Sequence, residues 1–253
     1  MIDVEGLAAE LFEAEQRATS VPLLSARYPE MDRPTARRIA RANDALSRRH
    51  DGDLVGWKLG WTSAAMRDAL GIDQPNWGSV WGRHVLDDAA PIARFVHPKV
   101  EPELVYRPDR KLAGQPTAED VAAAPGAWAL GLEVVDPRFP SFDFTALDNT
   151  ADNSSRAGIR TGAFVPLAAE RLDRISVTFA HGDAVRSGCS DQTMGSPAAT
   201  VAWLVARLDE EGSSLEAGQL VYTGGLTAPF NAVSGSTFEL RSDELGEIGL
   251  RFD

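Results

Sequence analysis

The chain has 253 residues, of which 43% are hydrophobic and 25% are charged, which is typical of globular proteins and excludes a disordered or collagen-like chain. The net charge of −12, from 25 Lys and Arg against 37 Asp and Glu, argues against a nucleic-acid partner, and no apolar run is long enough to cross a membrane. The single cysteine, Cys189, permits no internal disulfide, and with a start unlike a signal peptide it predicts a reducing, cytoplasmic setting.

Residues 1–53 carry the signals of two helices and predict an N-terminal helical lobe. Asp3 is placed to cap the first helix, whose apolar stripe consists of Val4, Leu7, Ala8, Leu11 and Phe12. Pro34 suits the first turn of a second helix, which runs toward Arg49 and ends at the turn formed by residues 51–53.

From Leu54 onward, short β-like runs separated by Gly and Pro predict a β-rich domain over residues 54–253. The candidate strands are 54–59, 99–106, 128–136, 158–167, 174–180, 219–223, 237–241 and 247–252. Two helices interrupt them, a short one over 63–70 and a longer one that begins at the cap Ser196 and ends at Gly212. The predicted fold class is therefore α+β.

Lys58 lies in a predicted strand between Gly56 and Gly60, on the face opposite to the apolar residues. The two missing side chains leave space for a ligand above it, and a lysine removed from water can serve as an acid or base. A solvated lysine on an edge strand fits the pattern equally well. The apolar face is predicted to contain Val55, Trp57, Leu59 and Trp61.

Three glutamates also lie in predicted strands. Glu101 and Glu103 are two residues apart and share a face, while Glu133 is the lone charge of an apolar strand. Like charges repel unless a cation lies between them, and carboxylates without His or Cys suit Mg²⁺ or Mn²⁺. The alternative is that Glu101 and Glu103 face solvent and that Glu133 pairs with an arginine.

Two further segments are rich in turn-forming residues. Residues 147–156, LDNTADNSSR, predict a polar loop between strands. Residues 222–227, YTGGLT, end a strand with two glycines, whose backbone N–H groups can approach an anion. Taken alone, each segment is better explained as a simple turn.

Taken together and in order, these segments resemble the 2-keto-4-pentenoate hydratase and 4-oxalocrotonate decarboxylase family, within the fumarylacetoacetase-like superfamily. The resemblance extends over roughly the whole chain. The matching segments are 56–63 (GWKLGWTS), 71–78 (GIDQPNWG), 101–103 (EPE), 133–136 (EVVD), 151–155 (ADNSS), 195–197 (GSP) and 220–227 (LVYTGGLT).

The resemblance implies a helical lobe on a mixed β-roll or barrel of the fumarylacetoacetase C-terminal-domain type, assembled as a homo-oligomer. It implies that Glu101, Glu103 and Glu133 hold Mg²⁺ or Mn²⁺ and that Lys58 is the catalytic acid/base residue. The residues that it implies for substrate binding are Thr62, Ser63, Asp73, Asp152, Ser154, Ser155, Thr223, Gly224, Gly225, Leu226 and Thr227.

The implied activity is that of a metal-dependent lyase. It hydrates a 2-hydroxy-2,4-dienoate, a 2-oxo-4-pentenoate-type small molecule, to a 4-hydroxy-2-oxo acid, as in the meta-cleavage catabolism of aromatic compounds. A 4-oxalocrotonate-type decarboxylase needs the same cation to stabilise an enolate, so the motifs do not separate the two. An acylpyruvate C–C hydrolase, disfavoured because the motifs hold no histidine, and an inactive metal or oxo-acid binder are further alternatives.

Four positions depart from the family pattern, and one of them is Pro137, where the family commonly has Ser. Pro102, between two of the glutamates, predicts an edge strand or a bulge. Asn76 stands where the family more often has an acid. Arg156 is unusual after Ser155 and is a candidate cation for a second substrate carboxylate.

Overall fold

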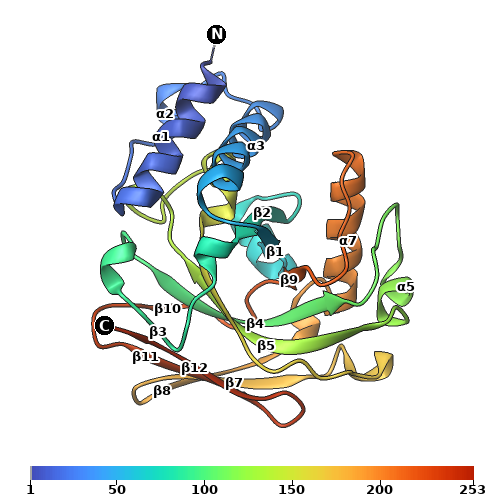
Figure 1. Ribbon diagram of the computed structural model, residues 1–253. Helices are drawn as coiled ribbons and strands as arrows, with labels where there is room; N and C mark the ends of the chain where they lie inside the picture. Colours follow the sequence, from blue (N-terminus) through green and yellow to red (C-terminus); the bar gives the residue numbers. More distant parts are fainter. Residues whose placement is uncertain (1) are drawn as a thin grey trace.

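The computed structural model describes residues 2–253, with only the backbone of Leu70. Three helices form a layer at one end of the molecule, a smaller sheet lies at the other end, and a larger curled sheet lies between them (Figure 1). The helices of this layer are α1 (Val4–Arg17), α2 (Leu24–Arg27) and α3 (Arg33–His50). In the part of the chain that is described, no helix is both long and apolar enough to span a bilayer.

The first long N-terminal helix begins at the predicted cap Asp3, and the second has the predicted Pro34 in its first turn after a cap, Asp32, that was not predicted. The Asp3 carboxylate accepts a hydrogen bond from the N–H of Gly6, and Asp32 accepts one from Thr35 with Pro34 in the first turn. The apolar core of this layer consists of Leu7, Ala8, Leu11, Leu24, Met31, Ala36, Ile39, Phe139 and Ala151. The last two of these come from far along the chain. The helical layer is thus completed by the segment that precedes β6, and a domain boundary at residue 53 stays a prediction.

The larger sheet is mixed and has the order β2-β1-β9-β4-β5-β6, with β10 beside β4. Strands β1 and β9 are parallel, and the other neighbours are antiparallel. The strands are β1 (Leu54–Gly60), β2 (Asn76–Trp81), β4 (Lys99–Pro108), β5 (Gly126–Val135), β6 (Arg156–Thr161), β9 (Leu220–Tyr222) and β10 (Phe230–Asn231).

The smaller sheet has the order β3-β12-β11-β7-β8 and packs with helix α7 (Pro197–Glu210) against one face of the larger sheet. Its strands are β3 (Ala89–Ala90), β7 (Ser176–His181), β8 (Ala184–Cys189), β11 (Thr237–Ser242) and β12 (Gly246–Phe252). Short helices complete the molecule: α4 (Ala64–Leu70), α5 (Ala118–Ala122), α6 (Ala146–Ala151) and the 3-10 turns Gly82–His84, Ile92–Arg94, Asn153–Ser155, Ala169–Arg171 and Ser190–Gln192. Helices beside two mixed sheets make the fold α+β, as predicted.

The two faces of the larger sheet bury different side chains. Trp57, Leu59 and Leu104 enter the main core on one face. The opposite face carries Val105 and Tyr222 in a smaller apolar cluster. Because side chains alternate along a strand, Lys58, Glu101, Glu103 and Glu133 all project from this second face. The candidate site therefore lies on the side of the sheet away from the main core.

The prediction of which residues form the apolar face of β1 is only partly correct. Val55 packs in the smaller cluster rather than the main core, because the pairing of β1 with β2 shifts register between Leu54 and Gly56. Trp61 follows the strand with a positive φ of 56°, which turns its side chain out of the alternating pattern. Both departures come from backbone irregularities at the ends of the strand.

The expectation of an edge strand at Pro102 is wrong. Strand β4 is an inner strand, paired with β5 along its whole length and with β9 and β10 on its other side. The carbonyl of Pro102 accepts from the N–H of Leu226, in the loop that separates β9 from β10. Since N–H and C=O of one residue point to the same side of an antiparallel strand, the proline faces this loop, where no ladder bond is lost.

Candidate metal centre and substrate pocket

Three carboxylates converge on the second face of the larger sheet. Glu101 and Glu103 come from β4 and Glu133 from β5, and the register places Glu101 directly opposite Glu133. One oxygen of each carboxylate lies within 4.8 Å of an oxygen of the other two. Glu103 is 0% exposed and Glu133 is 1% exposed, so neither faces solvent. The geometry is that of a cluster of oxygen ligands around a shared centre.

The carboxylates lack the partners that buried charges need. Glu103 Oε1 accepts no hydrogen bond, and neither oxygen of Glu133 accepts a well-directed one. Burial, together with the negative charge of Glu133, raises the pKa of Glu101 to about 7. The same causes raise the pKa of Glu103 well above its usual range. A cation among these oxygens would remove both the repulsion and the unmet acceptors.

Lys58, on β1, lies against this cluster. Its Nζ donates to the carbonyl oxygen of Ser154 at 2.7 Å and to Ser154 Oγ at 3.3 Å, and it lies 3.0 Å from Glu133 Oε1 as an ion pair. The side chain is 3% exposed, so it is not a solvated surface lysine. Glu133 therefore pairs with Lys58 and not with an arginine, which was the alternative.

The glycines beside Lys58 act differently from the expectation. A side chain on Gly56 would collide with the backbone of Leu220, and one on Gly60 would press on Ser154 Oγ. Gly56 therefore lets β9 pair closely with β1, and Gly60 lets Ser154 reach the lysine. The missing side chains bring protein atoms close instead of leaving open space.

The segment expected as a polar loop contains a helix and a strained turn. Thr145 and Asp148 cap helix α6 reciprocally, which is the spacing of a capping box. Asn153, Ser154 and Ser155 then follow with φ values of 48°, 58° and 56°. Three left-handed residues in succession are costly, so surrounding contacts must hold them. This turn places the Ser154 carbonyl oxygen where it accepts a hydrogen bond from Lys58 Nζ.

The glycine-rich loop after β9 supports the carboxylates. Gly224, with a φ of 99°, donates its N–H to Glu103 Oε2 at 2.7 Å, and a side chain there would collide with Thr62. Gly225 lines the cavity beside Glu101. The hydroxyl of Thr223 donates to a β4 carbonyl and is buried. The loop therefore closes one wall of the site with backbone groups.

A cavity of about 110 Å³ opens in front of Lys58 and Glu101. Five of the expected substrate-binding residues line it: Thr62, Ser63, Ser154, Ser155 and Gly225. The sequence reasoning missed the remaining lining residues, which are Gly60, Trp61, Met66, Val135, Phe142, Phe144 and Asn149. The aromatic spacing in the segment 139–144 is a signal that a search for polar motifs overlooks.

Several expected residues lie outside the lining of this cavity. The side chain of Asp73 is 83% exposed and pairs with Arg33. Asp152 is buried in an ion pair of 2.6 Å with Arg138, because its role is to hold the strained turn. Leu226 and Thr227 pack near Gly188 of β8. Asp73 thus lies at the surface, whereas Asp152, Leu226 and Thr227 make contacts within the fold.

Arg156 and Asn76 are also turned to structural contacts. The guanidinium of Arg156 is buried and donates to Asp44 and Ser47 of α3, so the expectation that it serves a second substrate carboxylate is wrong. Asn76 donates to Asn149 Oδ1, and Asn149 in turn donates to Ser155 Oγ. Two neutral amides, Asn76 and Asn149, are thus hydrogen-bonded in series behind the cavity. Asn76 is the position at which an acid was expected from the resemblance.

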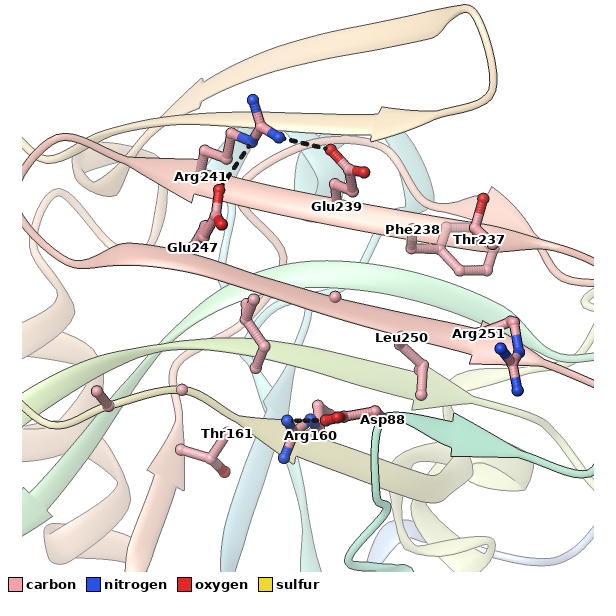
Figure 2. Close-up of a pocket in the computed structure, with 14 residues that line it drawn as sticks. Asp88, Arg160, Thr161, Thr237, Phe238, Glu239, Arg241, Glu247, Leu250 and Arg251 are labelled. Atoms are coloured by element: carbon pink, nitrogen blue, oxygen red, sulfur yellow. Dashed lines mark hydrogen bonds and ion pairs between the residues drawn. The ribbon is translucent and has the colours of Figure 1, made fainter.

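A wider hollow of about 610 Å³ lies over the smaller sheet, beside β6, β11 and β12 (Figure 2). Its charges pair with one another: Arg160 with Asp88, and Arg241 with both Glu239 and Glu247. None of the expected site residues lines it. Lys58 and Glu101 of the carboxylate cluster line the smaller cavity, so that cavity is the candidate site.

No family model matches the chain. It is 30% identical to a 2-keto-4-pentenoate hydratase from Paraburkholderia phymatum, over 98% of this chain and 97% of that protein. It is 29% identical to a 4-oxalocrotonate decarboxylase from Pseudomonas putida, over 98% of this chain and 96% of that protein. Its fold matches that of 4-oxalocrotonate decarboxylase from Pseudomonas putida G7, complexed with magnesium and adipate, with a TM-score of 0.92. The match covers 99% of this chain and 97% of that one, at 27% sequence identity.

A fumarylpyruvate hydrolase from Pseudomonas aeruginosa shares the fold at a TM-score of 0.58 and 19% identity, over 78% of this chain and 88% of that one. The protein therefore has the fumarylacetoacetase-like fold. Within it, the chain belongs to the 2-keto-4-pentenoate hydratase and 4-oxalocrotonate decarboxylase family.

Proposed function

We propose that the protein is a divalent-metal-dependent carbon–oxygen lyase that hydrates a 2-hydroxy-2,4-dienoate to a 4-hydroxy-2-oxo acid. The observation that carries the proposal is the buried carboxylate cluster, with unpaired oxygens, beside Lys58 at the wall of a small cavity. Relatives named 2-keto-4-pentenoate hydratase, at about 30% identity over the full chain, support the choice of reaction.

The donor set fits Mg²⁺ or Mn²⁺. Glu101, Glu103 and Glu133 offer hard oxygen atoms, and with the Lys58 ammonium the four groups sum to a charge of −2, which one divalent cation neutralises. The magnesium bound by the similar decarboxylase supports this choice. When bound, such a cation would act as a Lewis acid toward the 2-oxygen of the substrate.

Lys58 is the group best placed to move protons. In the proposed reaction the 2-hydroxyl loses a proton and C5 gains one, which converts the dienol into a conjugated 2-oxo-3-enoate. The oxygen of water then bonds to C4 and its proton ends on C3. Lys58 Nζ faces the cavity and is held by Ser154 and Glu133, so it can give up and recover a proton at a fixed position.

Other residues shape the site for this chemistry. The Ser63 and Ser155 side chains supply hydroxyl groups to the cavity wall, and the aromatic rings of Trp61, Phe142 and Phe144 exclude bulk water from it. Exclusion of water strengthens the electrostatic attraction between the substrate carboxylate and the positive groups of the site.

Decarboxylation of a 4-oxalocrotonate-type substrate is the second candidate function. The decarboxylases among the relatives and the TM-score of 0.92 favour it, and both reactions pass through the same enolate. An acylpyruvate hydrolase is less well supported, because no histidine lines the cavity among the described residues. A cytoplasmic location and a homo-oligomeric assembly stay predictions.

Product analysis tests the proposal directly. The protein and Mg²⁺ are incubated with 2-hydroxypenta-2,4-dienoate, and separately with 2-oxohex-3-enedioate, and products are followed by mass spectrometry and CO₂ release. We expect the first substrate to gain one water, and we expect exhaustive chelation to abolish turnover. Full activity after chelation, or no reaction with either substrate, contradicts the proposal, whereas CO₂ release alone favours the decarboxylase.

A further inference from the structure

We propose that the pocket selects 2-oxo acids whose far end is uncharged, so that its substrates are monocarboxylates and not dicarboxylates. This inference rests on the proposed function and concerns the same cavity. Its basis is the arrangement of charge along the walls: the ionic groups are gathered at one end, where a substrate carboxylate and 2-oxygen would bind. The rest of the wall is uncharged and combines aromatic and aliphatic side chains with a few neutral hydroxyl and amide groups.

Lys58 is the one cation among the described residues that line the cavity. Its Nζ donates to two oxygens of Ser154 and lies 3.0 Å from Glu133 Oε1 as an ion pair, so its charge is already compensated within the site. With a divalent cation, the three glutamates and Lys58 sum to zero charge. The substrate's first carboxylate then brings the site to −1, and a second would have no counter-charge.

The remainder of the wall suits an apolar tail. Trp61, Met66, Phe142 and Phe144 line it, and the rings of Phe142 and Phe144 lie with their centroids 6.1 Å apart. Met66 is 43% exposed while it lines the cavity, so it lies where the cavity opens. An alkyl or vinyl group gains by contact with these side chains, whereas a carboxylate would lose water without gaining a counter-charge.

The cations near the cavity are committed to other contacts. Arg156 donates to α3, and Arg138 pairs with Asp152. The guanidinium of Arg67 donates to the carbonyl oxygens of residues 61 and 62. Lys99 lies 3.7 Å from the ring centroid of Phe142 and lines a neighbouring cavity instead.

A matched pair of ligands tests the inference without turnover. 2-Oxohexanoate and 2-oxoadipate share six carbons and the 2-oxo acid head, and they differ only at the far end. Isothermal titration of the Mg²⁺-loaded protein should give a Kd at least tenfold lower for 2-oxohexanoate. Equal or tighter binding of 2-oxoadipate overturns the inference and leaves the proposed function standing. If neither ligand binds, the proposed function and the inference both fail.

Two variants link the preference to the wall. Met66→Arg places a cation at the partly exposed position, where the fold tolerates it, and should improve 2-oxoadipate relative to 2-oxohexanoate by about tenfold or more. Val185→Arg adds the same charge on exposed β8, outside the cavity, and should leave the ratio within about twofold. If both variants shift the ratio equally, net charge and not the wall sets the preference, and the inference is wrong.

Lys99→Met removes the cation that lies over the ring of the lining residue Phe142. We expect the ratio of the two Kd values to stay unchanged in this variant. A loss of 2-oxoadipate binding would show that Lys99 reaches the far carboxylate, which contradicts the inference.

Discussion

At the scale of single residues, the position of Lys58 combines two requirements. A lysine that transfers protons must be fixed near the substrate, and a buried ammonium must be compensated by nearby oxygens. The Ser154 carbonyl and Glu133 meet the second requirement, and the open side toward the cavity meets the first. Proton transfer and charge balance are therefore joined in one side chain.

Replacement of this lysine separates the two roles. Lys58→Met keeps most of the volume and removes the proton, so we expect kcat to fall by about 10²–10⁴ while Mg²⁺ still binds to the three intact carboxylates. Steady-state kinetics and isothermal titration measure the two effects. Lys111→Met, at an exposed ion pair with Glu216, serves as the control. A variant with near wild-type kcat would make Lys58 a bystander, and one that folds poorly would make it structural.

The metal ligands give a second prediction at this scale. Glu103→Gln keeps an oxygen for the N–H of Gly224 and removes one charge from the cluster, so the fold should persist. Mg²⁺ affinity should fall at least about tenfold, as measured by isothermal titration. Glu216→Gln, at the exposed pair with Lys111, is the control and should bind Mg²⁺ as the wild type does. Unchanged Mg²⁺ affinity in Glu103→Gln would place the metal elsewhere.

At the scale of elements, regular patterns were predictable and irregular backbone was not. The caps Asp3 and Ser196 and the first-turn Pro34 mark helices that the structure contains, and alternation in β4 and β5 places the glutamates on one face. The roles of these glutamates stay predictions. Short strands such as β2, β3, β8 and β10 were missed, because their pairing depends on partners distant in sequence.

Helix α6 and the turn after it show what sequence patterns miss. Thr145 and Asp148 carry a readable capping box, but the many turn formers after them favoured a loop. The left-handed turn at 153–155 has no glycine to announce it, since tertiary contacts and not local preference hold it. Its position against Lys58 was therefore visible only in the folded chain.

The contacts of this turn predict a stability effect. Asp152→Asn leaves the buried Arg138 guanidinium without its counter-charge, and loss of one partner of a buried ion pair costs about 3–5 kcal/mol of unfolding free energy. Urea denaturation measures it. Asp73→Asn, at the exposed pair with Arg33, should change stability by less than about 0.5 kcal/mol. If Asp152→Asn is as stable as wild type but binds substrate weakly, its role is in the pocket, as the sequence resemblance implied.

At the scale of the whole molecule, charge couples stability to pH and to metal. The net charge is −12, and the buried glutamates add repulsion that solvent screens little. The pKa of Glu101 is raised from 4.5 to about 7, so the folded state binds a proton more tightly than the unfolded state. That contribution to stability is present below pH 4.5 and is lost as pH rises through 7.

A thermal melt without metal should therefore show the wild type losing stability between pH 6 and 8 relative to Glu101→Gln, which has no charge to acquire. Buried His84, whose pKa is lowered, acts in the opposite direction, but it is present in both proteins and cancels in the difference. Each kcal/mol of unfolding free energy should move Tm by about 2–4 °C.

With Mg²⁺ at 100 times its Kd, binding to the folded state adds about 2.7 kcal/mol to the unfolding free energy of the wild type. The difference in Tm between the two proteins at pH 8 should then shift in favour of the wild type, because the variant has lost a ligand and gains less from Mg²⁺. If Mg²⁺ raises both Tm values equally, Glu101 does not hold the metal.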